Sequence, residues 1–118
     1  MADPLARAIQ RFVDTCPHVV AVRDLVTKVR IDLQGEYFVD LYYNATLGKY
    51  TYALIHGGRR VLGWDNARHH PGLAHFPHHV HRPDGSVESS SLVGDPEQDI
   101  DIVVAEVNAF LELWDSAK

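Results

Sequence analysis

The hydrophobic pattern of the chain changes its period near residue 28, and this change constrains the fold more than any other feature. Apolar residues alternate with polar ones over residues 28–33, and the alternation resumes over residues 37–43. A period of two is typical of strands that bury one face. Two further segments, Tyr50–His56 and Arg60–Trp64, are also rich in branched and aromatic residues. The sequence therefore predicts four strands.

Short turns separate these segments. Gln34-Gly35 lies between the first two, a loop with a glycine spans residues 44–49, and Gly57-Gly58 lies between the last two. A Gly-Gly pair between apolar segments is a strong signal for a β-hairpin. Because short connections join antiparallel neighbours and parallel strands need long crossovers, we expect a four-stranded antiparallel β-meander.

Helical patterns flank the strand region. Asp3-Pro4 is an N-cap followed by proline, apolar residues then repeat at helical spacing, and Cys16-Pro17 stops the pattern, so we expect a helix over Pro4–Thr15. The segment Val19–Leu25 is compatible with a strand or a short helix. A second helix should begin at Asp95-Pro96. Its apolar stripe comprises Ile100, Val103, Val104, Val107, Phe110, Leu111 and Trp114.

These elements together predict an α+β protein. The expected architecture is a four-stranded antiparallel β-meander packed with an N-terminal and a C-terminal helix. A length of 118 residues fits a single domain over residues 1–118. No apolar run reaches the length of a membrane span, and no signal-peptide pattern is present, so we expect a cytoplasmic protein. The single cysteine excludes an intramolecular disulfide and a cysteine-based zinc site.

Charge is distributed unevenly along the chain. The net charge of −5 argues against a protein that coats nucleic acid with its whole surface. Residues 95–115 contain seven acidic residues and no Lys or Arg, whereas residues 59–82 contain four arginines and one aspartate. The second region is therefore locally basic. We expect a phosphate site there, held by Arg60, Arg68 and Arg82.

Histidines are concentrated in the same basic region. Six of the eight lie between His69 and His81, in a segment that contains Pro and Gly and directly follows Asp65-Asn66. Histidine changes its charge near neutral pH and is the commonest metal ligand. We expect the segment to form one polar site at the edge of the sheet, outside the core. The candidate catalytic residues are His69, His70, His79 and His81.

Two chemistries suit such a cluster. His79 and His81 are two residues apart, so on an extended segment they share a side while His78 faces the other way. With Asp65 they would form a site for a divalent transition metal. Alternatively, two imidazoles would act as acid and base on RNA without metal, while arginines hold the phosphate. Asp65-Asn66 fits a turn equally well.

Two non-catalytic interpretations remain open beside these. The chain is then a metal-binding protein, or an interaction domain whose acidic final helix docks on a basic partner.

The histidine segment also resembles a known family. The residues that carry the resemblance are Trp64-Asp65-Asn66-Ala67, His69-His70-Pro71 and Phe76-Pro77-His78-His79-Val80-His81. This pattern resembles the TumE toxins of prokaryotic toxin–antitoxin systems, and it covers the middle third of the chain. The resemblance implies a small toxin neutralised by a cognate antitoxin, which often carries a helix-turn-helix domain. It does not specify a reaction.

Overall fold

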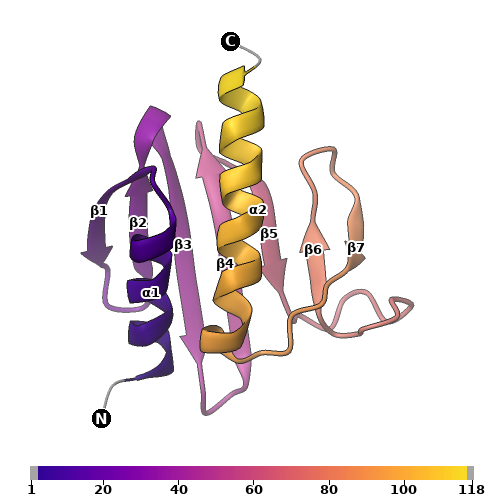
Figure 1. Cartoon of the computed structure of the whole chain (residues 1–118). Helices are drawn as coiled ribbons and strands as arrows, with labels where there is room; N and C mark the ends of the chain where they lie inside the picture. The colour runs from indigo at the N-terminus through magenta and orange to yellow at the C-terminus, as the bar shows by residue number, and fades with distance from the viewer. Residues whose placement is uncertain (1–2, 117–118) are drawn as a thin grey trace.

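The computed structural model describes residues 3–116 and shows two helices packed on one face of a sheet (Figure 1). This confirms the α+β class. The helices are α1 (Pro4–Thr15) and α2 (Pro96–Ser116). The strands are β1 (Val19–Asp24), β2 (Val29–Leu33), β3 (Tyr37–Asn44), β4 (Lys49–His56), β5 (Arg59–Asp65), β6 (His79–His81) and β7 (Val87–Ser89). A short 3₁₀ turn, Gln34–Glu36, joins β2 to β3.

The first helix begins where its capping signal predicts. The Asp3 carboxylate accepts a hydrogen bond from the Leu5 N–H at 2.9 Å, and Pro4 occupies the first helical position. Ion pairs from Arg7 to Glu97 and from Arg11 to Asp101 join α1 to α2. In α2 the apolar stripe from Ile100 to Leu111 packs on the sheet. The Trp114 side chain of that predicted stripe lies outside the described side chains.

The sheet has seven antiparallel strands in the order β1-β2-β3-β4-β5-β6-β7, so the prediction of four strands is wrong in number. The four predicted strands correspond to β2–β5. The additional β1 carries valines that are largely exposed, so its apolar residues do not alternate with polar ones as in a strand that buries one face. Strands β6 and β7 have three residues each, too few to show a period.

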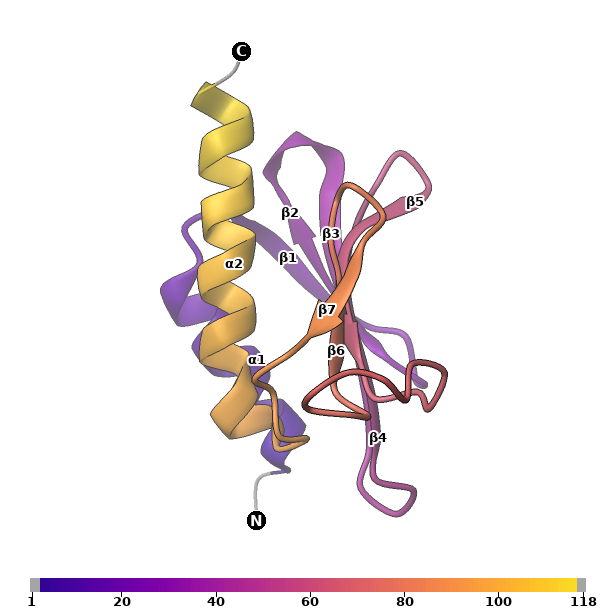
Figure 2. The same cartoon turned by 90° about the vertical axis from the view of Figure 1, so that its right-hand side faces the viewer.

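The two faces of the sheet differ completely. On one face, inward residues such as Leu54, Trp64 and Val80 form the core together with apolar residues of both helices. The other face, here called the open face, carries no helix (Figure 2). The connection between β5 and β6, residues 66–78, extends past the open face at one end, whereas its His75 lies on the helical side, where it borders a hollow with Trp64, Val80 and Ile102. A functional group placed on the open face is therefore reachable without disturbing the core.

Candidate functional site

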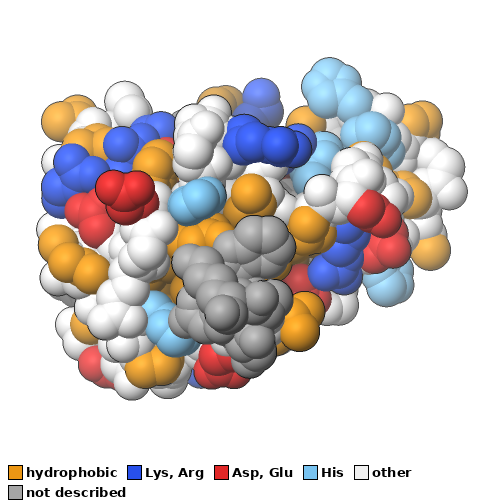
Figure 3. All heavy atoms as spheres, turned by 90° about the horizontal axis from the view of Figure 1, so that it is seen from above, with side chains coloured by type: hydrophobic (Ala, Val, Ile, Leu, Met, Phe, Trp, Pro, Cys, Tyr) orange, Lys and Arg blue, Asp and Glu red, His pale blue; other side chains and the backbone are white. Residues whose placement is uncertain are grey.

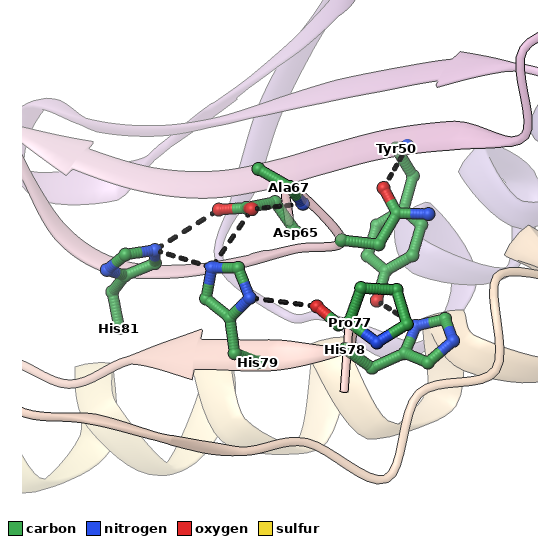
Figure 4. Close-up of polar contacts among 8 residues, drawn as sticks. Tyr50, Asp65, Ala67, Pro77, His78, His79 and His81 are labelled. Carbon is green, nitrogen blue, oxygen red and sulfur yellow. Dashed lines mark hydrogen bonds and ion pairs between the residues drawn. The ribbon is translucent and has the colours of Figure 1, made fainter. Parts of the chain in front are cut away.

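Strand pairing brings three predicted site residues together on the open face. Asp65 on β5 lies opposite His79 on β6, and His81 is two residue pairs further along, on the same face of the sheet. The His79 Nε2 atom lies 3.0 Å from Asp65 Oδ1, and the His81 Nε2 atom lies 3.2 Å from Asp65 Oδ2. The two Nε2 atoms are 3.1 Å apart (Figure 4). These three residues form what we call the Asp-His-His cluster.

Backbone groups hold the cluster in a fixed orientation. The His79 Nδ1–H donates to the Pro77 carbonyl at 3.0 Å, which points Nε2 toward Asp65 (Figure 4). The Asp65 carboxylate also accepts from the Ala67 N–H at 2.9 Å. Asp65 therefore closes a turn and contacts the imidazoles at the same time. Backbone bonds of this kind commonly orient the histidine and carboxylate ligands of metal sites.

The cluster contains fewer protons than its contacts require. Because His79 donates through Nδ1, its Nε2 in the neutral ring is a bare lone pair. That lone pair faces a carboxylate oxygen at 3.0 Å and the His81 Nε2 at 3.1 Å. A single N–H on His81 cannot satisfy both contacts, and His79 is 1% exposed. The arrangement is complete only with an additional proton or a cation at its centre.

Two further predicted residues lie against the cluster. The His70 ring packs edge-on against His79, with ring centroids 4.8 Å apart, and against His81 at 6.1 Å. The Arg60 side chain lies across Gly63, where a Cβ would stand 2.6 Å from Arg60 Cδ. Gly63 is the residue opposite His81. Burial and the positive charge of Arg60 lower the pKa of His81, with Asp65 opposing, so its neutral form is favoured.

The remaining histidines of the segment serve other purposes. His78 points to the helical face, as its spacing predicts, and its Nδ1 lies 2.8 Å from the Tyr50 hydroxyl. Burial lowers the pKa of His78 and raises that of Tyr50, so the hydroxyl donates this bond. The His75 Nδ1–H donates to the Ser90 carbonyl at 3.0 Å. His69 is exposed, and the structure does not bring it into the cluster.

The predicted phosphate ligands are separated in space. Arg60 alone lies beside the cluster, because Arg68 stacks on the Phe76 ring with its guanidinium carbon 4.9 Å from the ring centroid. Arg82 pairs with Glu88 at 2.8 Å and with Glu106 of α2 at 2.7 Å. Arg82 is thus committed to holding the β6–β7 hairpin against the helix.

One expectation about placement needs correction. The cluster lies one strand inside the sheet and not at its edge, because β7 and not β6 forms the edge. His79 is a buried strand residue, and it lies on the open face and not among the hydrophobic core residues.

Comparison with known protein families identifies the family of this chain. Residues 6–111 match the family described as toxin TumE. The chain belongs to the TumE family. It is therefore a toxin of a toxin–antitoxin system, and it has an antitoxin as its partner. No curated protein and no solved structure gave a significant match to the chain. None of the helices in residues 3–116 is long and apolar enough to cross a membrane.

Sequence reasoning missed Tyr42, Thr51 and Gly63 beside the site of this TumE toxin. Tyr42 and Thr51 continue the row of Asp65 and His79 across the open face, since Tyr42 lies opposite Thr51 and Thr51 lies opposite Asp65. Only strand register reveals this row. Gly63 carried a usable signal, because a glycine within a strand often marks a close approach by another group.

Proposed function

We propose that this TumE toxin acts on the phosphodiester backbone of RNA and that the Asp-His-His cluster carries the reaction with a bound divalent transition metal. The observation that carries the proposal is the convergence of Asp65, His79 and His81 on one point that lacks a donor. A cation at that point would satisfy all three groups at once. Two histidines and a carboxylate form a common ligand set for zinc and iron sites, with positions left for water and substrate.

The spacing of the ligand atoms supports a metal. Bonds of 2.0–2.1 Å to a tetrahedral or octahedral ion place neighbouring ligand atoms about 2.9–3.4 Å apart. The two Nε2 atoms are 3.1 Å apart, and they lie 3.0 and 3.2 Å from the two different oxygens of the Asp65 carboxylate, Oδ1 for His79 and Oδ2 for His81. The bond from His79 Nδ1 to a backbone carbonyl is the outer-layer contact that such ligands usually make.

The surroundings of the cluster suit a phosphodiester substrate. When bound, a divalent metal supplies Lewis acidity and an activated water. Arg60, beside His81, would hold a phosphate oxygen and stabilise its developing charge. His70 lies against both histidine ligands and is only partly buried, so it would protonate the leaving oxygen.

The interaction-domain alternative receives less support. The acidic residues of α2 that it requires are largely committed within the chain, since Glu97, Asp101 and Glu106 all pair with arginines. The Asp99 carboxylate accepts bonds from the Val93 and Gly94 backbone. For the antitoxin, the family resemblance leads us to propose a helix-turn-helix protein.

A direct test measures RNA cleavage by the purified chain. We expect wild-type protein to cut total RNA, a chelator to abolish cleavage, and zinc or manganese to restore it. His81→Asn should abolish cleavage because it removes one ligand at a partly exposed position. His75→Asn, a histidine change in the neighbouring loop, should retain it.

The outcomes separate the two parts of the proposal. Cleavage that resists exhaustive chelation would exclude the metal and leave acid–base catalysis by imidazoles. Cleavage by the His81→Asn variant at the wild-type rate would exclude the cluster. A wild-type chain that arrests growth and leaves all RNA intact would exclude RNA as the substrate.

A further inference from the structure

In the part of the chain that the structure describes, basic side chains without a carboxylate partner lie on both sides of the Asp-His-His cluster. Six Lys and Arg side chains form ion pairs, namely Arg7, Arg11, Arg23, Lys28, Arg30 and Arg82. Within residues 3–116 the structure gives no carboxylate partner to the others, which are Lys49, Arg59, Arg60 and Arg68. In a chain of net charge −5, such a selection of free cations indicates an anionic ligand.

These free cations line two hollows that flank the Asp-His-His cluster. Arg59 and Arg60 line a hollow of about 210 Å³ that His81, Arg82 and the carboxylate of Asp84 also border. Lys49 and Arg68 line a larger hollow of about 430 Å³. Basic side chains lie directly beside a group of histidines in the view from above (Figure 3). Because β5 runs from Arg59 to Asp65, the hollows lie near opposite ends of this strand with the cluster between them.

The larger hollow has an aromatic wall beside the cluster. Tyr42 and Thr51 line it, and both belong to the cross-strand row that continues to Asp65 and His79. Neighbours in such a row have Cβ atoms about 5 Å apart, so the Cβ of Tyr42 is about 10 Å from the Cβ of Asp65 along the row. Its volume falls within the range of pockets that accept small organic groups.

The lining chemistry matches a nucleobase next to a phosphate. The Tyr42 ring is only partly buried and offers a face for stacking, and the exposed Leu47 adds apolar surface. Lys49 and Arg68 supply the charge for an adjacent phosphate, and none of the residues that line the hollow is Asp or Glu. Proteins that bind single strands combine aromatic stacking with a basic groove in this way.

We propose that a single-stranded RNA crosses the open face between the two hollows, with one base stacked on Tyr42, the reacting phosphodiester at the Asp-His-His cluster, and the following phosphate at Arg59 and Arg60. This inference rests on the proposed function for its central step, and it adds the form of the substrate. A base paired in a duplex cannot enter the larger hollow, so the strand must be unpaired there.

Binding measurements test the inference without requiring cleavage. The full chain carrying Asp65→Asn is titrated into a fluorescein-labelled single-stranded oligoribonucleotide of about ten nucleotides, and anisotropy is followed at several salt concentrations. In this background Tyr42→Leu should weaken binding about 5-fold or more at every salt concentration, because stacking is lost and no charge changes. Tyr42→Phe, which keeps the ring, should bind as the background chain does.

Charge variants give the second arm. Lys49→Met with Arg68→Met should lower the slope of log affinity against log salt by about 1.4, since each phosphate contact on a single strand contributes about 0.7. Arg7→Met with Arg11→Met removes the same charge from the helical side and should leave the slope unchanged. The duplex form of the same RNA should bind more weakly than the single strand.

The results distinguish this inference from the proposed function. The path of the single strand between the two hollows is here called the track. Equal binding by Tyr42→Leu and Tyr42→Phe, or equal binding of duplex and single strand, would overturn the track even if the wild-type chain cuts RNA. The predicted losses of binding, together with a wild-type chain that leaves RNA uncut, would support the track and overturn the reaction. A slope that falls equally in both charge variants would show non-specific attraction and overturn the track.

Discussion

Two buried carboxylates on the open face, Asp40 and Asp65, have opposite kinds of partners. Asp40 on β3 is 7% exposed and is paired by Arg30 and by Lys28, each at 2.8 Å. Asp65 on β5 is 9% exposed, and besides the Ala67 N–H its partners are two imidazoles, one of which turns an unprotonated nitrogen toward it. Asp40 and the cluster residue His81 belong to one cross-strand row. In this row Asp40 lies opposite Ala53, Ala53 opposite Gly63, and Gly63 opposite His81.

This difference separates a structural ion pair from a reactive site. Arg30 and Lys28 are charged at every physiological pH, so Asp40 is neutralised permanently, and Arg30 also stacks on the Phe38 ring at 4.0 Å. The Asp65 site obtains its balancing charge only from a proton or a metal. A buried carboxylate whose balancing charge comes from a proton or a metal therefore marks the reactive site, and one paired with permanent cations marks a structural ion pair.

The largest expected effect comes from removing each carboxylate in turn. Asp65→Asn should abolish growth arrest when the chain is expressed without its antitoxin, because the cluster loses its only anionic ligand. Asp40→Asn should still arrest growth at temperatures where the variant remains folded. Growth curves after induction, with protein levels checked by immunoblot, measure both effects. Growth arrest by Asp65→Asn at wild-type protein levels would show that toxicity does not depend on the Asp65 carboxylate.

Metal should stabilise the two variants differently. A ligand at 100 times its Kd stabilises the native state by about 2.7 kcal/mol, which for a domain of this size raises Tm by about 10 °C. We expect zinc or manganese to raise the Tm of wild type and of Asp40→Asn by similar amounts. The Tm of Asp65→Asn should stay unchanged. Thermal unfolding of metal-free protein with and without added metal checks this, and an equal rise in all three proteins would place the metal elsewhere.

The smallest expected effect concerns the stability that Asp40 supplies. Asp40→Asn should lower the free energy of unfolding by about 1–3 kcal/mol, less than for a fully buried pair because Lys28 and Arg30 are partly exposed. Urea unfolding at neutral pH measures this loss. Asp40 on β3 lies three strands away from His81 on β6 in the sheet order, so added metal should not change the result.

The same variant has a defined pH dependence. Burial raises the pKa of Asp40, but Arg30 and Lys28 together lower it by more than burial raises it, so the folded pKa lies below the ordinary value of 3.8. The contribution to stability is therefore complete above that ordinary value and is lost as the pH falls through the lowered folded pKa. The stability difference between wild type and Asp40→Asn should shrink over this acidic range. A difference that instead grows on acidification would contradict the assigned ion pair.

Sequence reasoning succeeded where local signals decide the structure. The Asp3 cap and the Gly57-Gly58 turn were sufficient to place α1 and the β4–β5 hairpin. The two-residue spacing of His79 and His81 was sufficient to pair them. Strand register depends on contacts between distant residues, so the sequence could not show that Thr51 lies beside Asp65 or that Arg82 turns toward α2. Burial of His79 was missed for the same reason.

The alternation along β6 makes the chemistry of this toxin sensitive to the register of one short strand. His78 and Val80 face the helices, whereas His79 and His81 face Asp65. A shift of β6 by one residue against β5 would exchange the two sets of side chains. The chain would keep the same number of histidines, yet Asp65 would lose both of them as partners and the core would receive two imidazoles. The connection over residues 66–78 that delivers β6 in this register also carries Arg68, His70 and Pro77, so natural variation in length should be absent from the strand and from the segments around these residues.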